Sequence, residues 1–428
     1  MKESMYKSYE DLPKIKLPEG NSDINISDST IRDGSQMPGI VMKGRHKLQI
    51  FEYLHRIGVE KLETFLFTKG DQSIVKEMLN RGYEIPEITG WARANPKDID
   101  YVINMDGIEE TGILMSVSDS HIIDKMGLKN REEAEKKYLE ALDYAIDHGL
   151  RVRCHLEDVT RSDVEGFLIP FTKKIIERSP DAIIRLCDTL GYGVPFIDSI
   201  YPYSLPKMIR EMKNIGVKNI ETHVHDDFGL GSATSLAGFW YGANWSSLTF
   251  LGIGERAGNS EIEKMLIFLE YRLEGFHKYN LECFTEFSRY IEDELGIRVP
   301  RNKAVVGKNI FAHESGIHTA GVIKNPFTYE PYPPDLVGGT RQIMIGSTSG
   351  TEVIRFRVEE AMKELMHLDV SIKKDDHRIQ SIHKDIQKLY DEGERVSCIS
   401  DEEIRGYVEK YYMLRPIIEK DIASEKED

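Results

Sequence analysis

The segment KNIETHVHDDFG (residues 218–229) contains two histidines one residue apart, His223 and His225. Alternate residues of a β-strand face the same side of a sheet, so both imidazoles would enter one space if this segment is a strand. Imidazole is a common protein ligand for divalent transition metals, and a pair of them needs at least one further donor. A histidine pair on a strand is more often packed or exposed than bound to a metal, so the neighbouring elements decide its chemistry.

Eight short β-like runs alternate with amphipathic helical segments between about residues 24 and 280. In chain order the runs are INISDSTIRDG, VEKLETFLF, EITGWARA, ETGILMSVSD, RVRCHLEDVT, AIIRLCDTLG, NIETHVHDD and SSLTFLGIGE. Several helical segments end at a glycine, which takes the left-handed conformation just past a helix end. These are Gly58, Gly82, Gly149, Gly216 and Gly242. Eight βα units over roughly 250 residues predict an α/β fold, a (β/α)8 TIM barrel. A doubly wound open sheet is the alternative with the same rhythm.

The pattern divides the chain into four parts. We expect residues 1–23 to form an N-terminal extension and residues 24–280 to form the TIM-barrel domain. Residues 281–349 are rich in Gly, Pro and aromatic residues, and we expect an irregular linker or subdomain there. Residues 350–428 contain charged amphipathic segments such as TEVIRFRVEEAMKELMHL, which predict a small helical C-terminal domain.

The composition narrows the class of partner and the location. The 56 basic and 72 acidic residues give a formal net charge of −16, which argues against nucleic acid or an anionic membrane as a partner. No apolar run approaches the ~20 residues that span a bilayer, and the N-terminus lacks the apolar core of a signal peptide. The cysteines are scattered and have no CxxC spacing, which indicates a reduced cytoplasmic protein. They are Cys154, Cys187, Cys283 and Cys398.

The barrel hypothesis supplies a third ligand for the histidine pair. In such barrels the active site forms at the C-terminal ends of the strands, and alternate strands contribute to the same interior layer. Asp33 ends the first run and the histidines end the seventh, so Asp33, His223 and His225 are expected to meet. Two imidazoles and one carboxylate leave open positions for a substrate on a divalent ion. Glu221 stands two residues before His223, faces the same way, and is expected to support the ligands.

Four motifs in order along the chain resemble those of one family, the DRE-TIM metallolyases, which are metal-dependent acyl-CoA condensing enzymes. The motifs are DSTIRDGSQ (28–36), HVHDD (223–227), GIGERAGN (252–259) and FAHESGIHTAG (311–321). The family includes 2-isopropylmalate, homocitrate and citramalate synthases and the Re-face citrate synthase. The resemblance implies a TIM barrel that binds acetyl-CoA, a 2-oxo acid and a divalent metal ion. It also implies a domain-swapped homodimer.

The resemblance assigns roles to individual residues. Arg32 is expected to stabilise the alkoxide that forms when the methyl carbon of acetyl-CoA attacks the oxo acid. Glu157 matches a catalytic-site glutamate of the family, and Asn259 matches the asparagine that completes the metal shell in isopropylmalate synthases. His318 matches a general base that enters the barrel of the partner subunit, and Tyr329 matches a tyrosine that assists this base.

The fifth run predicts part of the substrate site. Arg153, His155 and Glu157 alternate in RCHLE, so all three are expected to face the barrel interior, where charged groups need polar partners. By resemblance, Arg153 binds the distal carboxylate of a 2-oxo diacid. By the same resemblance, Gln36 lines the oxo-acid pocket, and Thr189 forms a hydrogen bond with the oxo-acid carboxylate. His155 stands where homocitrate enzymes have a small serine, which shortens the pocket and favours oxaloacetate over 2-oxoglutarate.

We therefore expect an acyltransferase that catalyses a metal-dependent Claisen condensation of acetyl-CoA with oxaloacetate to give citrate. Homocitrate synthase is the next hypothesis, followed by 2-isopropylmalate or citramalate synthase. A 3-hydroxyacyl-CoA lyase would need a reactive cysteine in a Gly-rich loop after the eighth run, and none of the four cysteines lies there. A non-catalytic metabolite sensor would bind metal without turnover. Mn2+ is the expected ion, and the same donors accept Mg2+, Co2+ or Zn2+.

Overall fold

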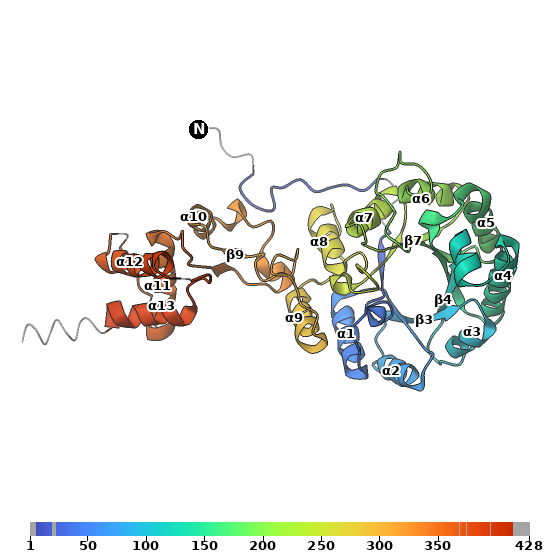
Figure 1. Cartoon of the computed structure of the whole chain (residues 1–428), viewed down its shortest axis with the longest axis horizontal. Coiled ribbons are helices and arrows are strands. Elements are labelled where there is room, and N and C mark those ends of the chain that lie inside the picture. Colours follow the sequence, from blue (N-terminus) through green and yellow to red (C-terminus); the bar gives the residue numbers. More distant parts are fainter. Residues whose placement is uncertain (1–5, 19–22, 368, 374, 394, 414–428) are drawn as a thin grey trace, which may run out of the picture. The chain divides into compact units, whose positions relative to one another are not determined.

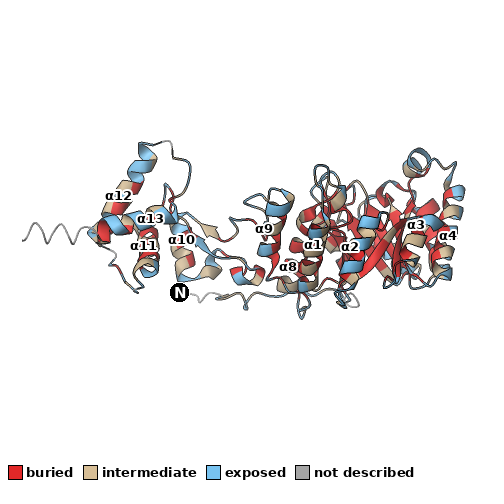
Figure 2. Ribbon diagram, turned by 90° about the horizontal axis from the view of Figure 1, so that it is seen from below, coloured by how far each residue is buried: buried red, intermediate tan, exposed pale blue. Residues whose placement is uncertain are grey.

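The chain forms two compact units. One is Lys14–Val299, and the other joins Met1–Pro13 to Pro300–Asp428. Each unit has its own buried core, shown in red in Figure 2. The computed structural model describes residues 6–18, 23–367, 369–373, 375–393 and 395–413.

A closed barrel of eight parallel strands, built from described residues, forms the centre of the unit Lys14–Val299 (Figure 1). Each strand pairs with the next along the chain, and β8 pairs with β1 to close the ring. The strands are β1 (Asn25–Asp28), β2 (Lys61–Thr64), β3 (Glu87–Arg93), β4 (Glu110–Ser116), β5 (Arg151–Glu157), β6 (Ile183–Asp188), β7 (Asn219–Val224) and β8 (Trp245–Leu248). The predicted TIM barrel is confirmed, and closure of the ring excludes the open doubly wound sheet.

Helices follow the strands and surround the barrel (Figure 1). They are α1 (Gly44–Ile57), α2 (Lys69–Leu79), α3 (Pro96–Ile103), α4 (Arg131–Asp147), α5 (Ile169–Arg178), α6 (Leu205–Asn214), α7 (Gly231–Tyr241) and α8 (Ile262–Arg272). Apolar residues at helical spacing give them an inward face, as in α1, where Ile50, Leu54 and Ile57 are buried. Polar caps begin several helices. At the start of α4, the Asn130 side chain accepts a hydrogen bond from the backbone N–H of Glu133.

The predicted helix ends at glycine are confirmed by the backbone conformation. All five glycines have a positive φ: Gly58, Gly82, Gly149, Gly216 and Gly242. At Gly58 the φ of +89° directs its N–H to the carbonyl of Leu54 at 3.0 Å, which closes the last turn of α1. The chain can then turn directly into β2, whose end lies at the site.

The barrel unit continues past the predicted boundary at residue 280. Helix α9 (Phe284–Leu295) lies in the stretch expected to be irregular. The ring of its Phe287 stacks on Tyr53 of α1, with centroids 4.5 Å apart, and on Phe250, with centroids 3.9 Å apart. These aromatic contacts bury the apolar face of α9 and join it to the barrel.

The second unit is mainly helical. Its elements include β9 (Ala312–His313), α10 (Gly316–Lys324), β10 (Gln342–Ile343), α11 (Thr351–Met366), α12 (His377–Asp391) and α13 (Asp401–Val408). Its core includes Ile354, Ile379, Ile382 and Val408. The predicted helical region is confirmed as far as Met413, and its last residues lie outside the described part of the chain. Among the described residues, no helix combines the length and apolar character needed to cross a bilayer.

Candidate metal centre and active site

Asp33, His223 and His225 come together at the C-terminal end of the barrel, where the sequence places them. Asp33 follows β1 in a tight turn, His223 belongs to β7, and His225 follows that strand directly. Oδ2 of Asp33 lies 3.4 Å from Nε2 of His223 and 3.8 Å from Nε2 of His225. One ligand atom from each residue lies within 4.8 Å of the others, and all three side chains are buried. This arrangement is a candidate metal cluster, called the metal cluster below.

The electrostatics of the metal cluster fit a divalent ion. Burial, together with neighbouring His223, lowers the pKa of His225 to about 4, so this imidazole is neutral and offers a lone pair at neutral pH. Burial opposes ionisation of Asp33, but Arg32 and His223 outweigh it and hold the pKa of Asp33 well below its usual range. An anionic carboxylate beside two imidazoles is a donor set that several divalent metals accept.

Asn259 adds a further donor beside Asp33. Its Nδ2 donates to Oδ2 of Asp33 at 3.0 Å, and its Oδ1 is buried without a hydrogen-bond partner among the described residues. The glycines of GIGERAGN make room for it. A Cβ on Gly254 would lie 2.3 Å from Nδ2 of Asn259, and a Cβ on Gly258 would lie 1.8 Å from the carbonyl oxygen of Gly252. The orphaned Oδ1 is an acceptor of the kind that a fourth metal ligand requires.

Arg32 is fixed beside the metal cluster by a buried carboxylate. Its Nε donates to Oε2 of Glu63 at 2.5 Å, and its Nη1 lies 3.6 Å from Oδ2 of Asp33. Burial disfavours the charged guanidinium, but Glu63 and Asp33 outweigh burial and raise the pKa of Arg32. A permanent positive charge therefore stands next to the cluster, which is the position that stabilisation of an alkoxide needs.

Glu63 links Arg32 to further ion pairs in the barrel interior. Its Oε1 accepts a hydrogen bond from Nη1 of Arg185 at 2.8 Å, and Nε2 of His155 lies 3.2 Å from the same oxygen. Nε of Arg185 donates to Oε2 of Glu221 at 2.5 Å. Burial, together with Arg185, lowers the pKa of His155 to about 4, so this ring is neutral at neutral pH.

The ion pairs continue to the N-terminal end of the barrel. Arg153 pairs with Glu221 and donates from Nε to Oε1 of Glu110 at 3.0 Å. Lys61 pairs with the same Glu110. Nη2 of Arg153 is buried and has no hydrogen-bond partner among the described residues. Positive and negative side chains thus alternate through the interior, and we call this series the ion-pair chain. Its members are Asp33, Arg32, Glu63, Arg185, Glu221, Arg153, Glu110 and Lys61.

The expected support of the metal ligands by Glu221 is wrong. Its oxygens bond to Ser27, Arg153 and Arg185. Glu221 shares a strand face with His223 but lies two residues earlier, so it belongs to the interior layer below the metal cluster. Arg185 is absent from the predicted site, although an arginine inside the apolar run AIIRLCD was a signal for it.

Glu157 lies at the end of β5 among three donors. Oγ of Ser116 donates to its Oε2 at 2.5 Å, and Nδ1 of His121 lies 3.1 Å from the same oxygen. Nζ of Lys125 donates to its Oε1 at 2.6 Å. Burial opposes ionisation, but these donors outweigh it and lower the pKa of Glu157 to about 2. Glu157 is therefore an anion at neutral pH. His121 and Lys125 are not among the predicted residues, although their spacing of four in SHIIDK places them on one helix face.

Thr189 and Gln36 lie in different surroundings. Oγ1 of Thr189 accepts a hydrogen bond from the backbone N–H of Asp158 at 2.9 Å. A hydroxyl that accepts one bond still has a proton to donate, as binding of a substrate carboxylate requires. Gln36 is exposed, in the short turn that follows Asp33.

His318 and Tyr329 belong to the second unit, where they lie together. His318 stands on α10, and its ring centroid is 4.1 Å from that of Tyr329. Both side chains are exposed. Gly321 permits the approach of the tyrosine, because a Cβ there would lie 3.2 Å from its ring. The contact between these two residues fits the predicted base and its assistant, and their entry into a barrel stays a prediction.

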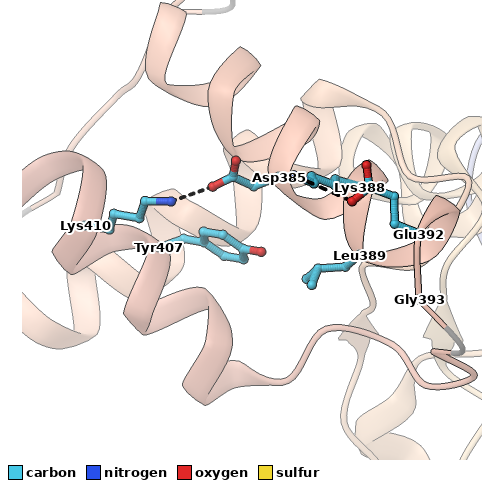
Figure 3. A pocket seen from close by; sticks show the side chains of 7 residues that line it. All are labelled: Asp385, Lys388, Leu389, Glu392, Gly393, Tyr407 and Lys410. Atoms are coloured by element: carbon cyan, nitrogen blue, oxygen red, sulfur yellow. Dashed lines mark hydrogen bonds and ion pairs between the residues drawn. The ribbon is translucent and has the colours of Figure 1, made fainter.

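The second unit also has an open pocket of about 430 Å³ beside α12 and α13 (Figure 3). It is lined by Asp385, Lys388, Leu389, Glu392, Gly393, Tyr407 and Lys410. Nζ of Lys410 lies 2.7 Å from Asp385, and Nζ of Lys388 lies 3.5 Å from Glu392. The charges of this pocket therefore neutralise one another, and the predicted site residues lie elsewhere.

Comparisons with known proteins place these features in a family. Residues 23–291 match the HMGL-like family, and residues 305–394 match the homocitrate synthase post-HMGL domain-like family. A citrate (Re)-synthase of Clostridium kluyveri is 36% identical, with 96% of this chain and 93% of that protein covered. A homocitrate synthase of Methanothermobacter thermautotrophicus is 35% identical, with 81% and 85% covered.

The fold is shared with a solved hydroxymethylglutaryl-CoA lyase from Pseudomonas aeruginosa. The TM-score is 0.55 at 15% identity, and the match covers 66% of this chain and 96% of that one. At this identity the likeness concerns the barrel alone. The family match over residues 23–291 and the relatives above one-third identity establish the enzyme class as well as the barrel fold. The chain belongs to the HMGL-like family and, within it, to the acyl-transferring condensing enzymes.

Proposed function

We propose that this enzyme condenses acetyl-CoA with a 2-oxo diacid, and that oxaloacetate is the substrate and citrate the product. The observation that carries the proposal is the polar interior beneath the metal cluster. It is formed by Glu63, His155, Arg185 and Glu221, each at most 2% exposed. The isopropyl group of 2-oxoisovalerate would be buried there among charged and polar side chains, whereas a second carboxylate is itself polar and suits such an interior.

The reacting oxo acid would lie between the metal cluster and Arg32. Asp33, His223 and His225 would hold the divalent ion, for which we propose Mn2+, with Asn259 as a further ligand. Such an ion supplies Lewis-acid polarisation of the keto group when it is bound. Arg32 stabilises the negative charge that develops on the keto oxygen as the new carbon–carbon bond forms.

Other barrel residues orient the oxo acid. Thr189 donates a hydrogen bond to the carboxylate next to the keto group, and Gln36 lines the oxo-acid pocket. Arg153 provides positive charge for the distal carboxylate, which its buried and unpartnered Nη2 supports. Glu157 stays ionised, so in this proposal it orients donors at the mouth of the barrel and does not itself supply a proton.

His318 is the proposed base, with Tyr329 beside it. The imidazole takes a proton from the methyl group of acetyl-CoA, and the resulting enolate carbon attacks the keto carbon to give an alkoxide. The alkoxide takes up a proton, and water then cleaves the thioester and releases CoA with a free thiol. We propose that both residues come from the partner subunit of a domain-swapped homodimer.

Homocitrate synthesis from 2-oxoglutarate is the second candidate. The match of residues 305–394 to a homocitrate synthase domain supports it, as does the position of Arg153 at a deeper level of the barrel. The two candidates differ by one methylene in the substrate, so the depth of the pocket separates them.

Release of free thiol from acetyl-CoA in the presence of Mn2+ tests the proposal. Oxaloacetate, 2-oxoglutarate, 2-oxoisovalerate and pyruvate are compared in parallel, with Asp33→Ala as the inactive control. We expect the highest kcat/KM with oxaloacetate. A preference for 2-oxoglutarate would establish the second candidate, and no thiol release with any of the four oxo acids by a metal-loaded enzyme would refute condensation.

A further inference from the structure

Arg185 is a buried cation in the barrel interior to which the reaction above assigns no role. It stands on β6, and its side chain is 1% exposed. Its guanidinium contacts Glu221 on the neighbouring β7 and also reaches Glu63 on β2, across the closed ring of strands. Its Nη2 lies 3.4 Å from Oγ of Ser27 on β1. A group that touches these three strands from β6 lies near the axis of the barrel.

Arg185 lies one layer beneath the metal cluster. In the strand register it is paired with Glu221, which stands two residues before His223. A strand advances about 3.3 Å per residue, so the two layers are about 7 Å apart. On its other side Arg185 is paired with His155, and Arg153 stands two residues before that histidine, one layer deeper. Arg185 therefore lies between the metal cluster and Arg153.

Two guanidinium groups in this interior have N–H groups that lack good partners. Nη2 of Arg153 is buried and has no hydrogen-bond partner among the described residues. The bond from Nη2 of Arg185 to Ser27 is long at 3.4 Å, beyond the usual range for N–H···O. Buried donors are almost always satisfied in folded proteins. Both arginines also pair with Glu221, which holds them close together. An anionic oxygen atom from a ligand would satisfy these donors.

We propose that Arg185 is a specificity-determining residue that binds the second carboxylate of the oxo acid, with Arg153 behind it. The inference rests on the proposed function of the same site. The charges of the ion-pair chain support this role of Arg185, because its eight side chains are four carboxylates and four cations. A divalent ion adds two positive charges. A substrate with two carboxylates balances them, whereas a substrate with one leaves an excess charge in a buried site.

Oxaloacetate and pyruvate are matched probes because they differ only in the second carboxylate. We expect Arg185→Gln to lower the ratio of kcat/KM for oxaloacetate to kcat/KM for pyruvate by about tenfold to a hundredfold, the range for a hydrogen bond to a charged group. Arg185→Lys keeps the charge that Glu63 and Glu221 need but has one nitrogen in place of a fork, so we expect a loss of at least about threefold. Arg56→Gln is the control, since the ion pair of Arg56 with Glu286 lies at the surface of the barrel unit, away from the site, and the ratio should not change.

Calorimetric binding of citrate and citramalate to the Mn2+-loaded protein gives a readout that needs no turnover. These products also differ by one carboxylate, and we expect Arg185→Gln to weaken binding of citrate about tenfold or more while binding of citramalate is retained. Equal losses for both products, or a folded Arg185→Lys protein with the wild-type ratio, would overturn the role of Arg185. Wild-type enzyme that condenses neither oxo acid would refute the proposed function alone, and a selective loss of citrate binding would still support Arg185.

Discussion

Arg32→Gln should separate charge stabilisation in the reaction from metal binding. Arg32 contacts Glu63 and Asp33, but it is not one of the ligand residues of the metal cluster. Glutamine keeps a donor for Glu63 and removes the positive charge. Loss of one donor that stabilises an oxyanion lowers kcat about 10²- to 10³-fold, or about 2.7–4 kcal/mol. We expect a decrease in this range, with metal content and the KM for the oxo acid nearly unchanged.

The effect of Arg32→Gln on stability should be smaller than the effect on catalysis. Breaking a buried ion pair costs about 3–5 kcal/mol when the other charge is left unpaired. Glu63 keeps Arg185 at 2.8 Å and His155 at 3.2 Å, so the free energy of unfolding should fall by only about 1–3 kcal/mol. Arg56→Gln is the matched control, because its ion pair with Glu286 lies at the surface and contributes at most about 1 kcal/mol.

Three measurements on each variant distinguish the two effects. Thiol release at saturating substrate gives kcat, elemental analysis gives the metal content, and urea denaturation gives the free energy of unfolding. The expected decrease in kcat is larger than the decrease that this small loss of stability would cause through partial unfolding. A folded, metal-replete Arg32→Gln enzyme with kcat within about threefold of the wild type would refute the role given to this residue.

Three other predictions follow from the site. Asp33→Ala and His223→Ala should each remove metal and activity together, as measured by elemental analysis and thiol release, and a metal-replete variant would contradict the ligand assignment. His318→Ala should keep its metal and lose turnover, and normal turnover would exclude it as the base. Burial, with Arg185, lowers the pKa of His155 from 6.5 to about 4, so its unfolded form binds more protons than its folded form between these values. The stability present above pH 6.5 should fall by up to about 3 kcal/mol as the pH drops toward 4. His155→Gln should reduce this slope in urea denaturation, and an unchanged slope would mean that another group causes it.

The strands and the metal cluster could be predicted because both depend on rules that act over short distances. Alternation within HVH places two side chains on one face of a strand, and the ring geometry of a barrel places the end of β1 two strands from the end of β7, with β8 between them, so that both supply the same interior layer. Asp33, His223 and His225 therefore meet as expected. Glycine after a helix also depends on local backbone conformation, and for this reason the helix ends were predicted correctly.

Two kinds of feature could not be predicted: the level of a side chain along the barrel axis, and its contacts with residues that are distant in the sequence. Glu221 faces the same way as His223, but the periodicity does not say that it lies one layer lower, among arginines. Glu157 was predicted, whereas its neighbours His121 and Lys125 come from the short helical segment Ser120–Lys125 after β4. Helix α9 continues the barrel past residue 280 because Phe287 has aromatic partners that are distant in the sequence.

The ion-pair chain is better explained by function than by stability. Replacing a buried ion pair with apolar residues of similar volume is often neutral or stabilising, and the interior of such barrels is commonly filled by branched apolar side chains. Here the chain begins at Asp33, in the metal cluster, and its inner glutamates each have two cationic neighbours. Removal of an inner member of the ion-pair chain leaves its partner as an unpaired buried charge. The deepest pair, Glu110 and Lys61, fixes the guanidinium of Arg153 from below. Loss of Lys61 should therefore lower stability, whereas loss of Arg185 should change both stability and substrate choice.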